Sequence, residues 1–141
     1  WGYEVIIDSA EQQLFWIGHE MPFRWLSVHW RDGSIIEDFD SAKEYIINFP
    51  REYFKNIQYS ENYFELSITN DFNHWFTWEV NGLWESINDT QGGPFLGYLF
   101  YDGITDRTYY IHAMIFYPGN NKTILLKQLA LIAKSFIVRN K

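Results

Sequence analysis

Apolar side chains recur along this chain at two spacings, and those spacings limit the possible folds more than any other feature. In most segments they occupy every second position, as in 63–69, where Phe64, Leu66 and Ile68 alternate with mostly polar residues. That spacing places them on one face of a β-strand. Only two segments, about 41–55 and the stretch after residue 121, have the three- and four-residue spacing of an amphipathic helix. The pattern predicts a sheet with two main helices.

The order of these segments predicts the sheet type. The expected strands are 3–7, 14–20, 25–31, 63–69, 76–87, 94–101 and 108–117. Most connections are short, including a hairpin loop at 21–24 and a turn at 118–121 that leads into the last helix. Consecutive strands with short connections pair antiparallel. We therefore predict one α+β domain over residues 1–141, an antiparallel sheet of about six to seven strands packed with two main helices.

Three positions carry a local prediction. Asp40 or Ser41 is suited to cap the first helix, because each side chain can accept a hydrogen bond from a free backbone N–H. Pro50 lacks an N–H group, so it is expected to kink or split that helix. Gly82, inside the run 76–87, predicts a bulge or a close approach of another backbone.

Charge and composition exclude several classes of protein. The net charge is −7, which disfavours a general nucleic-acid binder. There is no cysteine, so disulfides, thiolate catalysis and zinc–thiolate sites are impossible. No apolar run approaches the roughly 20 residues that span a bilayer. Residues 107–141 hold six basic side chains and no acidic one. This basic stretch is either a solvated helix face or a docking surface for an anionic partner.

No arrangement of reactive side chains indicates catalysis. The histidines lack the spacing of metal ligands; they are His19, His29, His74 and His112. Glu79 and Glu85 are roughly 20 Å apart on an extended strand, too far for glycoside hydrolysis. Glu65 could face either of them across a strand pair. No serine stands in a Gly-x-Ser-x-Gly motif. We expect no metal, no cofactor and no catalytic residue.

The aromatic residues exceed what a small core requires. The chain has 7 Trp, 10 Tyr and 12 Phe residues. One interpretation is that all of them pack in the core and against the sheet. The other is that some are exposed, as in sugar platforms and protein interfaces. Trp25, Trp30 and Trp75 flank predicted loops and are the candidates for a ligand or partner surface.

Several motifs in the second half of the chain resemble a known family. They are Asn81-Gly82-Leu83-Trp84-Glu85, Gly92-Gly93-Pro94-Phe95, Phe116-Tyr117-Pro118-Gly119 and Lys127-Gln128-Leu129. The sequence is similar to the C-terminal half of uncharacterised Bacteroidetes lipoproteins, a domain of unknown function. Gly2-Tyr3-Glu4 and Leu14-Phe15-Trp16-Ile17 extend the resemblance to the first strands. Gly92, Gly93 and Pro94 are interpreted as a structural turn into a strand. The order of strands and helices also looks like the PsbP/Mog1-type sandwich.

The resemblance implies a periplasmic or outer-membrane setting, with membrane contact only through a lipid anchor upstream of this C-terminal portion. It implies no catalytic residue. We therefore expect a non-enzymatic module of the bacterial cell envelope that binds a protein or glycan partner. Two alternatives stay open. One is a carboxylate-dependent hydrolase completed by an N-terminal half, and the other is a purely structural domain that packs on that half.

Overall fold

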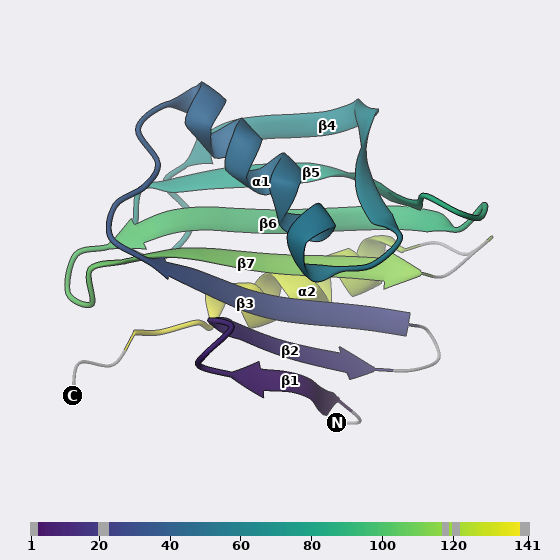
Figure 1. The fold of residues 1–141 in the computed structure, drawn as a ribbon, viewed down its shortest axis with the longest axis horizontal. Helices are drawn as coiled ribbons and strands as arrows, with labels where there is room; N and C mark the ends of the chain where they lie inside the picture. Colours follow the sequence, from purple (N-terminus) through teal and green to yellow (C-terminus); the bar gives the residue numbers. More distant parts are fainter. Residues whose placement is uncertain (1–2, 20–22, 117–118, 120–121, 139–141) are drawn as a thin grey trace.

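The computed structural model describes residues 3–19, 23–116, 119 and 122–138. They form one seven-stranded sheet with two helices (Figure 1). The elements are β1 (Glu4–Ser9), β2 (Leu14–His19), β3 (Phe23–Asp32), α1 (Phe39–Tyr53), β4 (Ile57–Thr69), β5 (Thr77–Ser86), β6 (Gly92–Asp102), β7 (Arg107–Phe116) and α2 (Thr123–Lys134). Every strand pair is antiparallel, so the predicted α+β class is confirmed. Residues 21–22, 118 and 120–121 of the predicted loop and turn lie outside the described residues.

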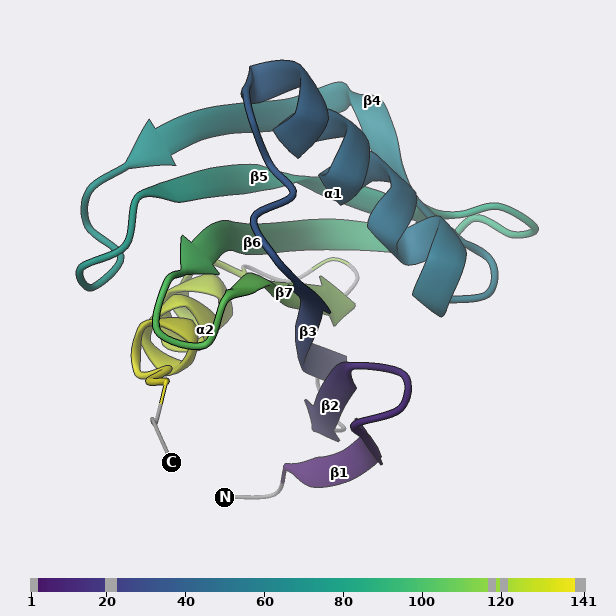
Figure 2. The ribbon, with the colours of Figure 1, turned by 60° about the vertical axis from the view of Figure 1, so that its left-hand side comes forward.

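The strand order β1-β2-β3-β7-β6-β5-β4 follows from two meanders joined by a helix. The first three strands form one meander. The segment after β3 then leads to the far edge of the sheet, and helix α1 runs back across the sheet toward β3 (Figure 1). Strand β4 follows at the far edge and begins a second meander that returns to the middle. The last strand, β7, pairs with β3 and so joins the two meanders into one sheet. Helices α1 and α2 cover opposite faces (Figure 2).

Helix α1 begins at Phe39, two residues earlier than the sequence suggests. The cap is Asp38, whose carboxylate accepts a hydrogen bond from the Ser41 backbone at 2.8 Å. The Ser41 hydroxyl in turn accepts from the Asp38 backbone at 3.0 Å. This reciprocal arrangement satisfies two free N–H groups. The prediction of Asp40 or Ser41 as the cap was wrong, because Ser41 is the third helical residue and completes the box from inside.

Pro50 does not split helix α1. The helix continues to Tyr53, and Pro50 lies in its last turn. Only one intrahelical hydrogen bond is lost there, and the Pro50 carbonyl still accepts from Phe54 at 2.8 Å. The predicted split is therefore wrong: the missing N–H of Pro50 removes one bond to the preceding turn, and the neighbouring helical bonds carry the helix on to Tyr53.

Both faces of the central strands are buried. Along β6 and β7, Leu99 and Tyr110 point into the core under α1, while Phe100 and Ile111 point into the core under α2. Strands buried on both faces have no wet side, so apolar residues run through them almost without interruption. This makes β6 and β7 the centre of the molecule.

Strand β4 starts six residues before its predicted start, at Ile57 rather than residue 63. Its register against β5 shifts between Tyr59 and Phe64, where the strand bulges. Gly82 pairs with Phe64 at the end of this bulge, and a methyl group on it would overlap the Tyr63 carbonyl oxygen. The predicted close backbone approach at Gly82 is therefore confirmed.

The segment Gly92, Gly93 and Pro94 lies within β6 rather than in a turn. The three residues pair with Glu85, Trp84 and Leu83 of β5. Pro94 is tolerated because the ladder between β6 and β7 starts one residue later, so its missing N–H leaves no gap. Gly93 is required for a different reason: a side chain there would overlap the carbonyl oxygen of Ile115.

The substitution Gly93→Ala is expected to lower the free energy of unfolding by about 1–3 kcal/mol, because the added methyl group meets a fixed backbone oxygen. Urea denaturation followed by circular dichroism measures this. Gly103→Ala is the control, since its methyl group would meet only an aromatic carbon of Tyr101 at 3.8 Å. It should stay within about 0.5 kcal/mol of the wild type. Equal losses for both variants would contradict the close approach.

Candidate functional site

A groove of about 420 Å³ lies beside α2, on the face of the sheet that α2 covers. It exists because α2 packs mainly on β6 and β7, which leaves the inner side of β2 and β3 uncovered by helix (Figure 2). Its lining residues come from β2, β3, the end of β6–β7 and the segment after α2: Phe15, Val28, Trp30, Thr105, Arg107, Tyr109, Phe136, Ile137 and Val138. The lining is mostly aromatic and aliphatic, which is typical of binding sites.

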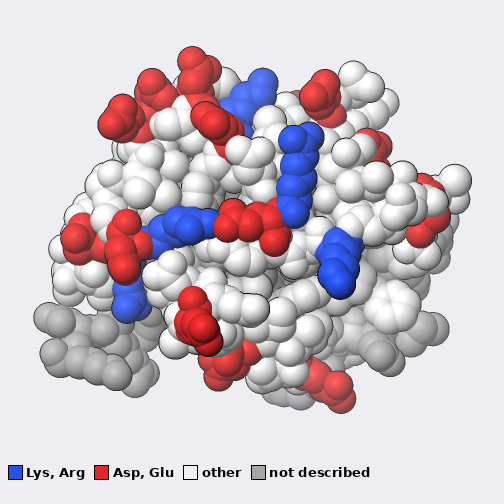
Figure 3. Space-filling view, in the orientation of Figure 1, with Lys and Arg blue, Asp and Glu red and all other residues white. Residues whose placement is uncertain are grey.

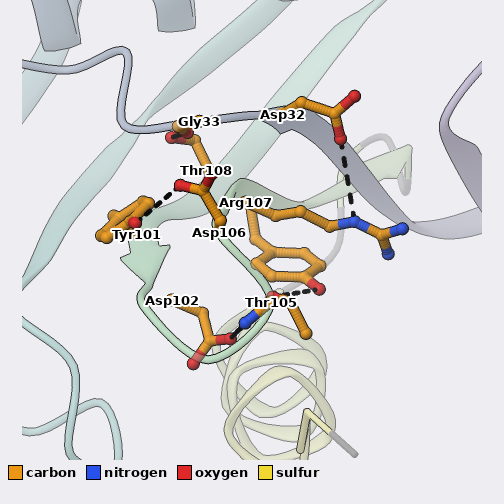
Figure 4. Close-up of polar contacts among 9 residues, drawn as sticks. Asp32, Gly33, Tyr101, Asp102, Thr105, Asp106, Arg107 and Thr108 are labelled. Carbon is orange, nitrogen blue, oxygen red and sulfur yellow. Dashed lines mark hydrogen bonds and ion pairs between the residues drawn. The ribbon is translucent and has the colours of Figure 1, made fainter. Parts of the chain in front are cut away.

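One wall of the groove is the loop between β6 and β7, held by a buried carboxylate. Asp102 accepts hydrogen bonds from the Thr105 backbone at 2.8 Å and the Thr105 hydroxyl at 2.6 Å (Figure 4). Its other oxygen accepts from the Trp75 indole at 3.1 Å. Thr105 also lies 3.2 Å from the hydroxyl of Tyr109. Each polar group is satisfied, so the loop presents Thr105 and Tyr109 in a fixed position.

The opposite wall is tied to the same loop. Arg107 lies 3.9 Å from Asp32 in an exposed ion pair (Figure 4). Its guanidinium lies 5.8 Å from the centre of the Trp30 ring. Next to it, Gly33 donates to the Asp106 carbonyl at 2.8 Å and accepts from the Thr108 hydroxyl at 2.7 Å. These bonds fix the end of β3 against the start of β7. The groove is therefore part of the rigid sheet.

A second hollow of about 300 Å³ lies further along the same side of α2. It is lined by Tyr3, Arg24, Gln128, Leu131 and Ile132. Arg24 lies 5.5 Å from the Tyr3 ring and donates to Gln128 at 3.4 Å. Large apolar side chains on this face are open to solvent: Ile137 in the first hollow is 63% exposed, Leu131 in the second 69%, and Val5 on β1 61%. The two hollows and these side chains, which lie on the same face of the sheet, are together called the α2 groove.

The three predicted tryptophans occupy different places. Trp30 lines the α2 groove. Trp25 points to the other face of the sheet, where it is half-buried and stacks on Phe23 at 6.0 Å. Trp75 is only 7% exposed and packs on Phe100, so it supports the loop through Asp102 and offers no open face to a partner.

Sequence reasoning missed Arg107, Tyr109 and Phe136 as groove residues. They come from β7 and from the segment after α2, and the fold alone brings them beside β3. The signal that could have indicated them is the basic stretch 107–141, which places a cation beside an aromatic strand.

A polar cleft of about 310 Å³ lies on the opposite face, between α1 and β3. At its base, the two ring nitrogens of His29 lie 2.5 Å from the Tyr45 hydroxyl and 2.6 Å from the Tyr53 hydroxyl. Arg31 and Glu52 form an ion pair in front of them. Around the cleft, acidic and basic side chains are interspersed (Figure 3).

Burial sets the protonation of this cleft. Burial, with the nearby Arg31 charge, lowers the pKa of His29 to about 3, so the ring is neutral at pH 7. Burial also raises the pKa of Tyr45 and of Tyr53, so both phenols keep their protons. The base of the cleft is therefore a neutral chain of hydroxyl and imidazole groups.

The described residues do not form the carboxylate or metal sites that the sequence left open. Glu65 pairs with Asn81, and Glu85 accepts a hydrogen bond from Gln58 at 2.9 Å, so these carboxylates lie along the outer strands. Within the described ranges, no three His, Asp or Glu side chains gather closely enough to hold a metal ion. In that same part of the chain, no helix has the length and apolar character needed to cross a membrane.

Comparison with known proteins gives a family but no characterised relative. A family model described as a domain of unknown function (DUF4837) matches residues 4–135. No curated protein matches the chain. No solved structure matches it either, so the likeness to PsbP/Mog1-type domains stays a prediction.

The loop wall gives a pH-dependent prediction. Burial raises the pKa of Asp102, but hydrogen bonds from Thr105 and Trp75 outweigh it and hold the pKa below its usual value. The carboxylate therefore stabilises the fold above its unfolded pKa of 3.8, and this contribution is lost as the pH falls through the lower folded value. Asp102→Asn should lose about 2 kcal/mol at pH 7, and less in acid. Denaturation at several pH values measures this.

The exposed Asp8→Asn is the control for that series, with little change expected at any pH. A deficit in Asp102→Asn that stays constant down to pH 2 would contradict the proposed role of the ionised carboxylate.

His112 gives a second pH dependence. The ring is buried between Phe49 and Tyr59, and burial lowers its pKa to about 3. Below pH 6.5 the unfolded chain binds a proton that the folded chain refuses, so stability falls by about 1.4 kcal/mol per pH unit for this ring. His112→Leu should reduce the slope of stability against pH by that amount between pH 6 and 4. If stability fell with pH at the same slope in both proteins, the buried ring would be taking up a proton in the folded state, and the prediction would be wrong.

Proposed function

The chain belongs to the DUF4837 family of domains of unknown function, and we propose that it is a binding module of the bacterial cell envelope. In this proposal the α2 groove binds an apolar segment of a partner protein. A binding role without catalysis fits the groove, because its lining supplies aromatic and aliphatic contacts and a few fixed polar groups.

The observation that carries this proposal is the apolar surface left open beside α2. Leu131 and Ile137 are more than half exposed, and Val5 is equally open on the strand opposite. Adjoining exposed apolar side chains next to a preformed hollow are typical of protein interaction sites. Burial of a side chain such as Leu131 contributes about 1.5–3 kcal/mol, which makes this surface a source of binding energy.

A protein partner fits the groove better than a glycan. A sugar ring binds on an open aromatic face, but the Arg107 guanidinium already lies over the Trp30 ring. Arg24 and Arg107 stand at the two hollows, and residues 107–141 hold no acidic side chain. Acidic side chains on the partner, next to its apolar ones, would complement these charges.

The envelope location rests on the resemblance to Bacteroidetes lipoproteins carried by Gly92-Gly93-Pro94-Phe95 and the neighbouring motifs. In the proposal, a lipid anchor of the longer protein supplies the membrane contact, and the groove faces a periplasmic or outer-membrane partner. The net charge of −7 supports a protein partner over nucleic acid.

Neither alternative has a comparable observation. For a hydrolase, the polar cleft offers Glu44 and Glu52, but Glu52 is already held in the ion pair with Arg31. In a purely structural domain, a neighbouring part of the same chain would pack in the α2 groove. The experiment below distinguishes this case by the chain to which the crosslinker attaches.

A photo-crosslinker placed at Leu131 tests the proposal in the full-length protein in its native envelope. The matched control position is Ile68, which is 50% exposed on the edge strand β4, away from the groove. We expect a defined adduct with a separate protein from position 131 and none from position 68. An adduct within the same chain would establish the structural alternative. Equal adducts at both positions, or none at 131, would contradict the proposal.

A further inference from the structure

The polar cleft between α1 and β3 ends in a connected set of hydrogen bonds. A neutral imidazole donates through one nitrogen and accepts through the other. One ring nitrogen of His29 therefore donates to one tyrosine hydroxyl and the other accepts from the second, with Tyr45 at 2.5 Å and Tyr53 at 2.6 Å. The Tyr53 oxygen also accepts from Arg31 at 3.4 Å.

These bonds tie Arg31 to both Glu52 and Tyr53. Arg31 forms the ion pair with Glu52 and donates to the Tyr53 oxygen at 3.4 Å. The side chain of Glu52 is 51% exposed, so its carboxylate sits at the open side of the cleft. An exposed ion pair of this kind contributes at most about 1 kcal/mol, and a ligand can exchange it.

The charges of the cleft select the kind of ligand. Its lining has one cation, Arg31, and two anions, Glu44 and Glu52. A free anion that displaced Glu52 would be repelled by both glutamates. A free cation would be repelled by Arg31. A ligand with a carboxylate and an ammonium group close together satisfies all three.

We propose that this cleft binds a free α-amino acid with an apolar side chain. Its carboxylate replaces that of Glu52 in front of Arg31 and Tyr53, and its ammonium group pairs with Glu44 and the displaced Glu52. The apolar part of the lining, formed by Ile35, Ile36 and Phe49, receives the side chain. A volume of about 310 Å³ is sufficient for such a molecule and too small for a folded segment.

The cleft is independent of the α2 groove. His29 and Arg31 point to the α1 face of β3, while Val28 and Trp30 point to the α2 face, because neighbouring residues of a strand alternate. Failure of one site therefore leaves the other untouched.

Titration of the protein with L-leucine, followed by ¹H–¹⁵N correlation spectra, tests the proposal. We expect saturable shifts at residues of the cleft. N-acetyl-L-leucine keeps the carboxylate but lacks the ammonium group, and L-leucinamide keeps the ammonium group but lacks the carboxylate. Each should bind at least tenfold more weakly than L-leucine.

Variants assign the two contacts. Arg31→Gln should weaken L-leucine binding at least tenfold through the carboxylate, and Glu44→Gln should do so through the ammonium group. Lys55→Gln, an exposed change just beyond the end of α1, is the control that should bind as the wild type does. Native spectra of each variant establish that it folds. The proposal would be overturned by the absence of a saturable shift with L-leucine, or by either derivative binding as tightly as L-leucine does.

Discussion

The pairing of β7 with β3 is the interaction on which the rest of the structure depends. All ten residues of Phe23–Asp32 pair with Arg107–Phe116, which joins the first meander to the second across almost the whole chain. Because β7 also pairs with β6 and is buried on both faces, it is the strand against which both cores are built. Such distant pairing is slow to form, because the intervening chain must be ordered before the two strands meet. At one end of the pair, Gly33 donates to the Asp106 carbonyl and accepts from the Thr108 hydroxyl, which ties the end of β3 to the start of β7.

The two candidate sites follow from how unevenly the helices cover the sheet. Helix α2 is short and lies over β6 and β7, so the curled strands β1–β3 leave the α2 groove open beside it. Helix α1 instead runs across the sheet from β5 toward β3, and it brings Tyr45, Glu52 and Tyr53 over the end of β3. One site is apolar with basic residues, and the other is polar with buried hydroxyl and imidazole groups. The same strand, β3, contributes Trp30 to the first and His29 to the second.

The sequence allowed the fold class to be predicted, because period-two and helical spacing report burial directly. It was less informative where a neighbour decides the geometry. Pro50 is harmless because the neighbouring helical bonds carry the helix on to Tyr53, and Gly92–Pro94 can form a strand because β7 pairs only from Phe95 onward. Trp30 was identified by its place beside a loop, but Trp75 has the same signal and is buried by Asp102 and Phe100. The polar cleft was missed because His29 and Tyr53 are 24 residues apart and meet only in the fold.

The α2 groove combines exposed apolar side chains with the basic residues Arg24 and Arg107. The most direct measurement is a titration with anilinonaphthalene sulfonate, an aromatic anion, followed by ¹H–¹⁵N correlation spectra of the native protein. The structure predicts saturable shifts confined to the groove, at Trp30, Arg107, Leu131 and Phe136. No binding, or shifts centred instead on the exposed residues Tyr63, Ile68 and Phe76, would contradict it.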